Sequence, residues 1–206
     1  MSDRREALQD SDNPARGRIL AAAFAVFMKK GYAAASTAEI AARAHVSKRE
    51  IYALVGNKQE VLIACITDRV RRLQLPTDLP VPGDRETLAQ VLASFGRQLI
   101  REISDPTFVA VFRLAVAEAA HAREVAQALE SIGRQAVREA LGDIMAQAEA
   151  SGIIEGRPAD CAEQFSGLLW GNLMISLLLG VAKRPDLEEI ETRARDAAAA
   201  FLRLHR

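Results

Sequence analysis

A short run that begins at Ser47 carries side chains suited to contacts with a polyanion. Lys48 and Arg49 are long hydrogen-bond donors, which suit phosphate oxygens or the edges of guanine bases. Tyr52 lies one helical turn further on, where its side chain can reach a phosphate or stack against a sugar and a thymine methyl group. The residue types and their spacing therefore predict a surface that contacts DNA.

Two residues outside this run add to the predicted surface. Thr37, in the first turn of the preceding helix, can donate to a phosphate beside the free N–H groups of that turn. Lys58, at the start of the following helix, is predicted to clamp the flanking DNA backbone. The alternative is that all these groups are ordinary solvated side chains.

The elements that must position this surface are marked by helix-capping patterns. Each pattern places a capping residue three positions before a glutamate, at Ser36–Glu39, Ser47–Glu50 and Asn57–Glu60. They predict helices over about 37–44, 48–54 and 58–74. A first helix is predicted from Pro14, after a capping Asn13, to about Lys30, with Gly31 as its left-handed cap. Two short helices joined by a tight turn behind a supporting helix are typical of a helix-turn-helix motif.

The distribution of charge supports a polyanion partner at the N-terminal end. The 206 residues hold 27 Lys+Arg and 27 Asp+Glu, so the net charge is zero. Divided at Pro76, in a stretch rich in proline, the chain separates into a part of charge +5 and a part of charge −5. Residues 14–75 alone carry +7. A chance solvated face remains the alternative explanation of charge by itself.

Residues 16–62 resemble the DNA-binding domain of the TetR/AcrR family of bacterial transcriptional regulators. The resemblance is carried by Ser36, Ile40, Ala41, Ala44, Val46, Ser47, Lys48, Ile51 and Tyr52, followed by Lys58 and Leu62, and by Phe27, Gly31 and Tyr32 at the end of the first helix. It implies an N-terminal helix-turn-helix, a larger C-terminal domain that binds ligand and dimerises, and release from operator DNA when a small molecule binds. It also implies that the last two helices make the dimer contact.

The sequence departs from the family pattern around the motif. His45 occupies the turn position that usually holds glycine, and histidine tolerates the left-handed conformation better than most residues. Arg49 replaces a frequent glycine and can add a base contact. Ala53, Leu54 and Val55 stand where an aromatic or histidine pair and a phenylalanine are common. These departures bear on the operator sequence.

The composition predicts an all-α chain with a three-helix helix-turn-helix domain and a larger helical body. Alanine occurs 38 times, and aromatic residues make up only 5%. We expect a disordered tail over 1–12, the DNA-binding domain over 13–58 and the ligand-binding and dimerisation domain over 59–206. In the last of these, helices are predicted over about 85–103, 106–120, 123–150, 158–180 and 185–204. Residues 112–118 and 167–171 are similar to the AefR-like group of C-terminal domains.

Two sets of residues are predicted to serve binding in the C-terminal body. An effector pocket of largely apolar character is predicted among Phe95, Leu99, Phe108, Phe112, Phe165 and Trp170. A filled core is the alternative for each of them. The predicted dimer contact comprises residues that permit close packing, namely Gly167, Gly171, Ala194, Ala197, Ala198 and Phe201, together with Leu202.

Other classes of function find no support in the residues. No phosphate-binding glycine loop, nucleophile elbow or catalytic carboxylate pair is present, so we expect neither an enzyme nor a cofactor. The three histidines lack metal-ligand spacing with Cys65 and Cys161, and redox sensing by either thiol is an alternative to a buried structural role. The polar N-terminus and the absence of a long apolar run predict a cytoplasmic protein without a membrane span. The function expected is a ligand-responsive homodimeric repressor that binds a palindromic double-stranded operator; a constitutive dimeric DNA-binding protein without effector is the alternative.

Overall fold

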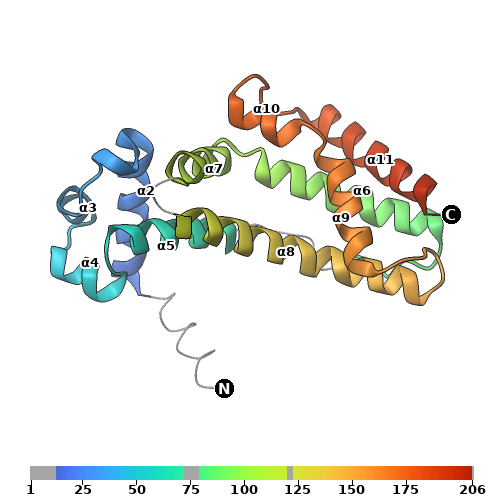
Figure 1. Ribbon diagram of the computed structural model, residues 1–206, viewed down its shortest axis with the longest axis horizontal. Helices are drawn as coiled ribbons and strands as arrows, with labels where there is room; N and C mark the ends of the chain where they lie inside the picture. The colour runs from blue at the N-terminus through green and yellow to red at the C-terminus, as the bar shows by residue number, and fades with distance from the viewer. Residues whose placement is uncertain (1–12, 72–78, 120–122, 206) are drawn as a thin grey trace, which may run out of the picture. The chain divides into compact units, whose positions relative to one another are not determined.

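The computed structural model describes residues 13–71, 79–119 and 123–205, and all regular structure within them is helical (Figure 1). The all-α prediction is therefore confirmed. The expected tail over 1–12 lies outside the described residues. The helices are α2 (Pro14–Ala34), α3 (Thr37–Ala44), α4 (Lys48–Leu54), α5 (Lys58–Arg71), α6 (Arg85–Ile103), α7 (Pro106–Glu118), α8 (Arg123–Ala150), α9 (Pro158–Trp170), α10 (Leu173–Leu179) and α11 (Leu187–Leu204).

The described residues divide into two compact units. The first contains α2 to α5 together with residues 110–119 and 123–132, and the second contains residues 79–109 and 133–205. The first unit therefore includes α5 as well as the helices of the predicted DNA-binding domain. The predicted domain boundaries at 58 and 59 stay a prediction.

In the first unit, α2 supports the two short helices. Its buried face repeats at helical spacing and comprises Ile19, Leu20, Ala22, Ala23, Val26 and Phe27. α3 and α5 pack against α2, and α4 packs against α3 and α2. The core contributed by the short helices is small, because α3 buries Ile40, Ala41 and Ala44 while α4 buries only Ile51. Such short helices are marginal alone, so their packing and their capped ends must hold them in place.

Two of the three capping patterns predicted from the sequence are present as reciprocal hydrogen bonds. The Ser47 hydroxyl accepts from the Glu50 N–H, and the Glu50 carboxylate accepts from the Ser47 N–H at 2.7 Å. Asn57 and Glu60 make the same reciprocal pair of bonds at the start of α5. His45 lies in the left-handed region with φ 54° and ψ 48°, as its position in the turn predicted. Local sequence therefore determines where these helices begin and how the turn is made.

The end of α2 differs from the prediction. Gly31, expected to finish the helix, has φ 76° and ψ 169°, but helical backbone resumes and the element continues to Ala34. A glycine is suited to this point because a side chain would strain the left-handed backbone. The additional turn places Tyr32 and Ala33 beyond the break.

In the second unit, α6 and α9 both pack against α11 (Figure 1). The core here is large and apolar: Phe95, Leu99, Phe165, Leu169 and Phe201 are fully buried. The rings of Phe165 and Phe201 meet edge to face, with their centroids 6.0 Å apart. At Gly96, an added Cβ would lie 2.9 Å from Leu169 Cδ1 and 3.3 Å from Ala194 Cβ. The absence of a side chain at Gly96 is therefore what lets α6, α9 and α11 approach closely.

The prediction of one helix over 158–180 is wrong. α9 ends at Trp170, Gly171 follows with φ 45° and ψ −122°, and α10 begins at Leu173. The apolar run continues through the break, so the pattern of hydrophobic residues did not reveal it. Gly180 ends α10 in the left-handed conformation, at the position where the predicted helix was expected to end. Among the described residues, no helix has both the length and the apolar character that crossing a bilayer requires.

Candidate DNA-binding surface

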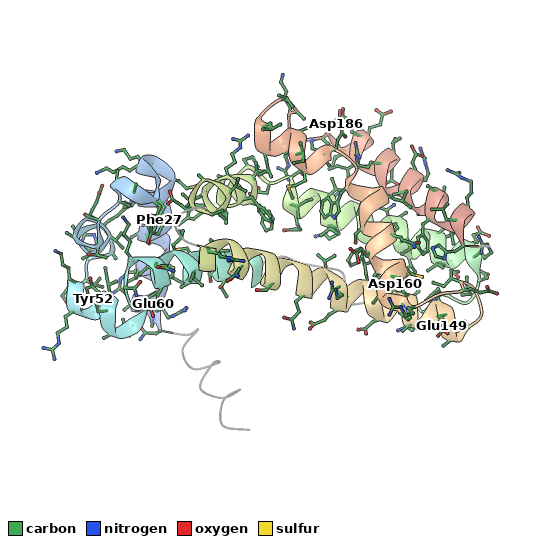
Figure 2. The ribbon with its side chains drawn as sticks, in the orientation of Figure 1. Phe27, Tyr52, Glu60, Glu149, Asp160 and Asp186 are labelled. Atoms are coloured by element: carbon green, nitrogen blue, oxygen red, sulfur yellow. The ribbon has the colours of Figure 1, made fainter. Side chains whose placement is uncertain are left out.

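The first residues of α4 present two cations to solvent. Lys48 and Arg49 are exposed, and within the described part of the chain neither has a hydrogen-bond or ion-pair partner. Tyr52 lies on the same short helix and is 56% exposed, an unusual state for an aromatic side chain (Figure 2). Ile51, between them in the sequence, is fully buried and fixes the rotation of α4. The burial of one side of α4 thus leaves the predicted contact residues on its outer side.

The start of α4 is held firmly by charge and capping. The hydrogen bonds from Ser47 lower the pKa of the Glu50 carboxyl below its usual value, with a smaller contribution from the charge of Arg18. Glu50 is therefore ionised at neutral pH and stabilises the positive end of the helix. The hydroxyl of Ser47 accepts the N–H of Glu50 and so caps the helix.

Thr37 occupies the predicted place at the first position of α3, after the capping Ser36. The Ser36 hydroxyl accepts from the Glu39 N–H, whereas the Glu39 carboxylate binds Lys30 at 2.8 Å. The Ser36–Glu39 capping pattern is thus only half formed, and the Glu39 carboxylate joins α3 to α2 instead. The half-buried Thr37 side chain lies at the end of α3 where N–H groups are free.

Lys58 is placed differently from the other predicted contacts. Its ammonium donates to the carbonyl oxygen of Ala33 at 3.2 Å and lies 4.4 Å from the centre of the Tyr32 ring. The ammonium thus has two partners within the chain. Five of the six predicted DNA-contacting residues belong to α3, to α4 or to the cap of α4, and Lys58 belongs to the contact between α5 and the end of α2.

Two cations that hold the motif together were not predicted as functional residues from the sequence. Arg18 donates from Nε to the carbonyl oxygen of Ala44 at 3.3 Å and so binds the end of α3. Lys30 pairs with Glu39 as described. These residues were counted only as part of the positive charge. Their partners are 26 and 9 positions away, so no local spacing pattern could have identified them.

The predicted effector-pocket residues are mostly core residues of the second unit. Phe95, Leu99 and Phe165 are fully buried, Phe108 is 6% exposed, and Trp170 is half-buried. Phe112, also half-buried, belongs to the first unit. The pocket therefore stays a prediction.

The predicted dimer residues divide into two groups. Gly167 and Gly171 are exposed, whereas Ala194, Ala197, Ala198 and Phe201 are buried in the second unit's own core. The outer surface of this region instead carries exposed apolar side chains, at Leu168, Ile175, Leu179, Val181 and Leu187. A groove between α9–α10 and α11 lies beside them and is lined in part by Leu168, Asn172, Thr192 and Arg203.

Two family models match the chain. Residues 19–65 match the bacterial regulatory proteins of the tetR family, and residues 90–206 match the C-terminal domain of AefR-like transcriptional repressors. The first match covers the helix-turn-helix and the second covers more than half of the chain. The chain belongs to the TetR family. The AefR-like resemblance of its C-terminal region is thereby confirmed.

Solved structures of TetR-family regulators have the same fold. A TetR transcriptional regulator from Agrobacterium tumefaciens is 25% identical, with a TM-score of 0.79 and coverage of 94% of each chain. The flavonoid-responsive regulator FrrA is 27% identical, with a TM-score of 0.78 and coverage of 93% of this chain and 97% of that one. The regulator FadR from Bacillus subtilis, in complex with stearoyl-CoA, is 18% identical with a TM-score of 0.63, covering 90% and 96%. No curated protein matches this TetR-family chain.

Burial limits the chemistry of the two cysteines in this TetR-family protein. Burial, followed by the charge of Asp68, raises the pKa of Cys65 to about 12, and its Sγ lies 3.5 Å from the carbonyl oxygen of Leu20. Burial and the charge of Asp160 also raise the pKa of Cys161. Neither thiol is therefore poised as a thiolate at neutral pH. The described residues contain no cluster of three or more histidine, cysteine or acidic side chains that would hold a metal.

Proposed function

We propose that this TetR-family protein is a ligand-responsive repressor that binds a palindromic double-stranded operator. Ser47, Lys48, Arg49 and Tyr52 of the α4 region and Thr37 of α3 make the contacts to DNA. The observation that carries the proposal is the pair of exposed cations, Lys48 and Arg49, without partners in the described chain, at the start of a capped second helix of a helix-turn-helix.

The geometry of the motif supports a particular contact for each of these residues. A recognition helix enters the major groove with its N-terminal residues against the base edges. In α4 these are Lys48 and Arg49: the planar guanidinium of Arg49 suits the O6 and N7 acceptors of guanine, and the ammonium of Lys48 binds a phosphate at the edge of the groove. Tyr52, one turn further, faces the sugar–phosphate backbone. Thr37 and the free N–H groups at the start of α3 bind a phosphate on the adjacent strand.

The form that binds the operator is proposed to be a dimer of two copies of this chain. The apolar side chains exposed on α9, α10 and α11, with the groove beside them, form the proposed dimer contact. Large apolar groups in solvent favour association. A twofold dimer presents two copies of α4 to successive major grooves, and the operator is then palindromic.

The effector is proposed to be a small, largely apolar molecule bound in the C-terminal region. Support comes from the aromatic residues of that region and from the flavonoid-responsive regulator FrrA, which is 27% identical. The ligand favours a dimer whose α4 helices are spaced wrongly for adjacent grooves. Thermal unfolding with a panel of small aromatic and acyl compounds separates this from a constitutive DNA-binding protein, because a ligand of the native state raises Tm.

Substitution of Arg49 tests the proposed contact to bases. A duplex recovered by repeated selection from a random-sequence pool with the wild-type protein serves as operator, and an unrelated duplex serves as non-specific DNA. Arg49→Ala weakens binding to the selected duplex about tenfold or more and affects the unrelated duplex much less. Arg195→Ala removes an exposed arginine of α11 and is the matched control. An equal loss on both duplexes would make Arg49 a phosphate contact, and failure to recover any palindrome would refute the operator proposal.

A further inference from the structure

The contact between Lys58 and the end of α2 joins two parts of the chain that are far apart in sequence. The Lys58 ammonium donates to the Ala33 carbonyl oxygen at 3.2 Å and lies over the face of the Tyr32 ring at 4.4 Å from its centre. A cation within about 6 Å of a ring centre is attracted by the negative face of the ring. Lys58 therefore binds both a backbone and a side-chain partner at the same place.

The segment that receives Lys58 is itself fixed. Gly31 leaves the helical conformation, and the Ala35 N–H donates to the carbonyl oxygen of Tyr32 at 3.2 Å. The Tyr32 ring also packs against Phe27, a buried residue of the α2 core, with the ring centroids 5.7 Å apart. The face of the Tyr32 ring is thus held in one place before Lys58 reaches it.

The backbone from which the Lys58 side chain extends is also fixed. Asn57 caps the start of α5, since its side-chain oxygen accepts the N–H groups of Gln59 and Glu60. The Glu60 carboxylate in turn accepts the Asn57 N–H at 2.7 Å (Figure 2 labels Glu60). Lys58 follows this cap directly as the first residue of α5. A rigid cap on one side and a rigid ring on the other leave the lysine side chain as the link between them.

The same segment is joined to the helix-turn-helix from the other direction. Lys30, just before Gly31, pairs with Glu39 in the first turn of α3 at 2.8 Å. The stretch 30–33 is therefore bound to α3 through Lys30 and to α5 through Lys58. Because α4 lies between α3 and α5 in the chain, these two links restrain the elements that flank the recognition helix.

We propose that Lys58 is a positioning residue for DNA binding: its ammonium ties the start of α5 to Tyr32 and Ala33 and so holds α3 and α4 in the arrangement that meets DNA. This positioning role replaces the phosphate contact that the sequence predicted for Lys58. The effect of this link on DNA binding rests on the proposed function, whereas the link itself does not. Lys48 is the contrasting case, because it also begins a helix but is exposed and has no partner within the described chain.

The first experiment measures the link without DNA. Urea unfolding is followed for the wild type, Lys58→Met, Tyr32→Leu, the double variant and Tyr32→Phe. Lys58→Met raises the unfolding equilibrium constant about two- to fivefold, and the double variant shows a smaller effect than the product of the single ones. Tyr32→Phe keeps the ring face, so Lys58→Met has the same effect in that background as in the wild type. Independent effects of Lys58→Met and Tyr32→Leu would overturn the proposal.

The second experiment separates positioning from phosphate contact. Binding of the selected duplex is titrated against salt for the wild type, Lys58→Met and the matched Lys48→Met. A phosphate contact contributes about 0.9 to the slope of log affinity against log salt. Lys48→Met reduces the slope by about that amount. Lys58→Met instead lowers affinity about two- to fivefold and leaves the slope unchanged. Tyr32→Leu also lowers affinity without a change of slope. A slope reduced equally by Lys58→Met would overturn the proposal. Failure of the wild type to bind any duplex specifically would refute the proposed function, and the unfolding experiment would still decide whether the link exists.

Discussion

The two units of this protein are each stabilised by a different kind of internal contact. In α6, α9 and α11, large apolar groups meet over a continuous core, with Phe95, Phe165 and Phe201 fully buried. The short helices α3 and α4 bury little, and polar groups hold their ends instead. Ser36 and Ser47 cap their starts, and side chains of α2 bind α3 through Ala44 and Glu39.

This difference shows how a helix can be positioned while most of its surface stays free. A helix held by its core must turn its side chains inward, as α11 does with Ala194, Ala198 and Phe201. α4 buries only Ile51 and is fastened at its start, so Lys48, Arg49 and Tyr52 remain available to a partner. This difference between the two units suits a protein that binds DNA through its helix-turn-helix and has a stable C-terminal core.

The largest effect is expected in the apolar core. Phe201→Ala removes a fully buried ring that packs edge to face on Phe165. The free energy of unfolding, measured by urea denaturation, should fall by about 3–5 kcal/mol because the loss of apolar burial is combined with a cavity. A cost below about 1 kcal/mol would show that this core is not what stabilises the C-terminal unit.

A smaller effect is expected at the start of α4. Ser47→Ala removes the hydroxyl that accepts the Glu50 N–H and should lower the free energy of unfolding by about 1 kcal/mol. Ser47→Thr keeps a capping hydroxyl and is the matched control. If alanine were as stable as serine at this position, the view that capped ends hold the recognition helix would be contradicted.

The smallest effect concerns the two cysteines, one in each unit. Because the pKa of Cys65 is raised to about 12 and that of Cys161 is also raised, both thiols stay protonated at pH 8. A disulfide reagent that releases a chromophore should therefore react with neither in the native protein and with both after denaturation. Rapid reaction of one thiol in the native state would show that its unit opens and would revive the redox alternative.

Local patterns predicted much of the fold and of the site. The capped helix starts and the His45 turn depend on residues within four positions of each other, and such interactions can be inferred from spacing. The role of Lys58 could not be inferred, because its partners Tyr32 and Ala33 lie about 25 positions away. The inward direction of Ala194 and Phe201 was missed for a related reason, since an apolar face does not reveal whether it meets the same chain or a second copy.

A cationic surface around α4 is expected to bind DNA in a chain whose net charge is zero. The most direct test is the salt dependence of wild-type affinity for the selected duplex, beside Lys48→Met and Arg49→Ala. Affinity should fall steeply as salt rises, with a log–log slope of several units, and each variant should weaken binding. A wild-type affinity that hardly changes with salt, and that neither substitution alters, would contradict it.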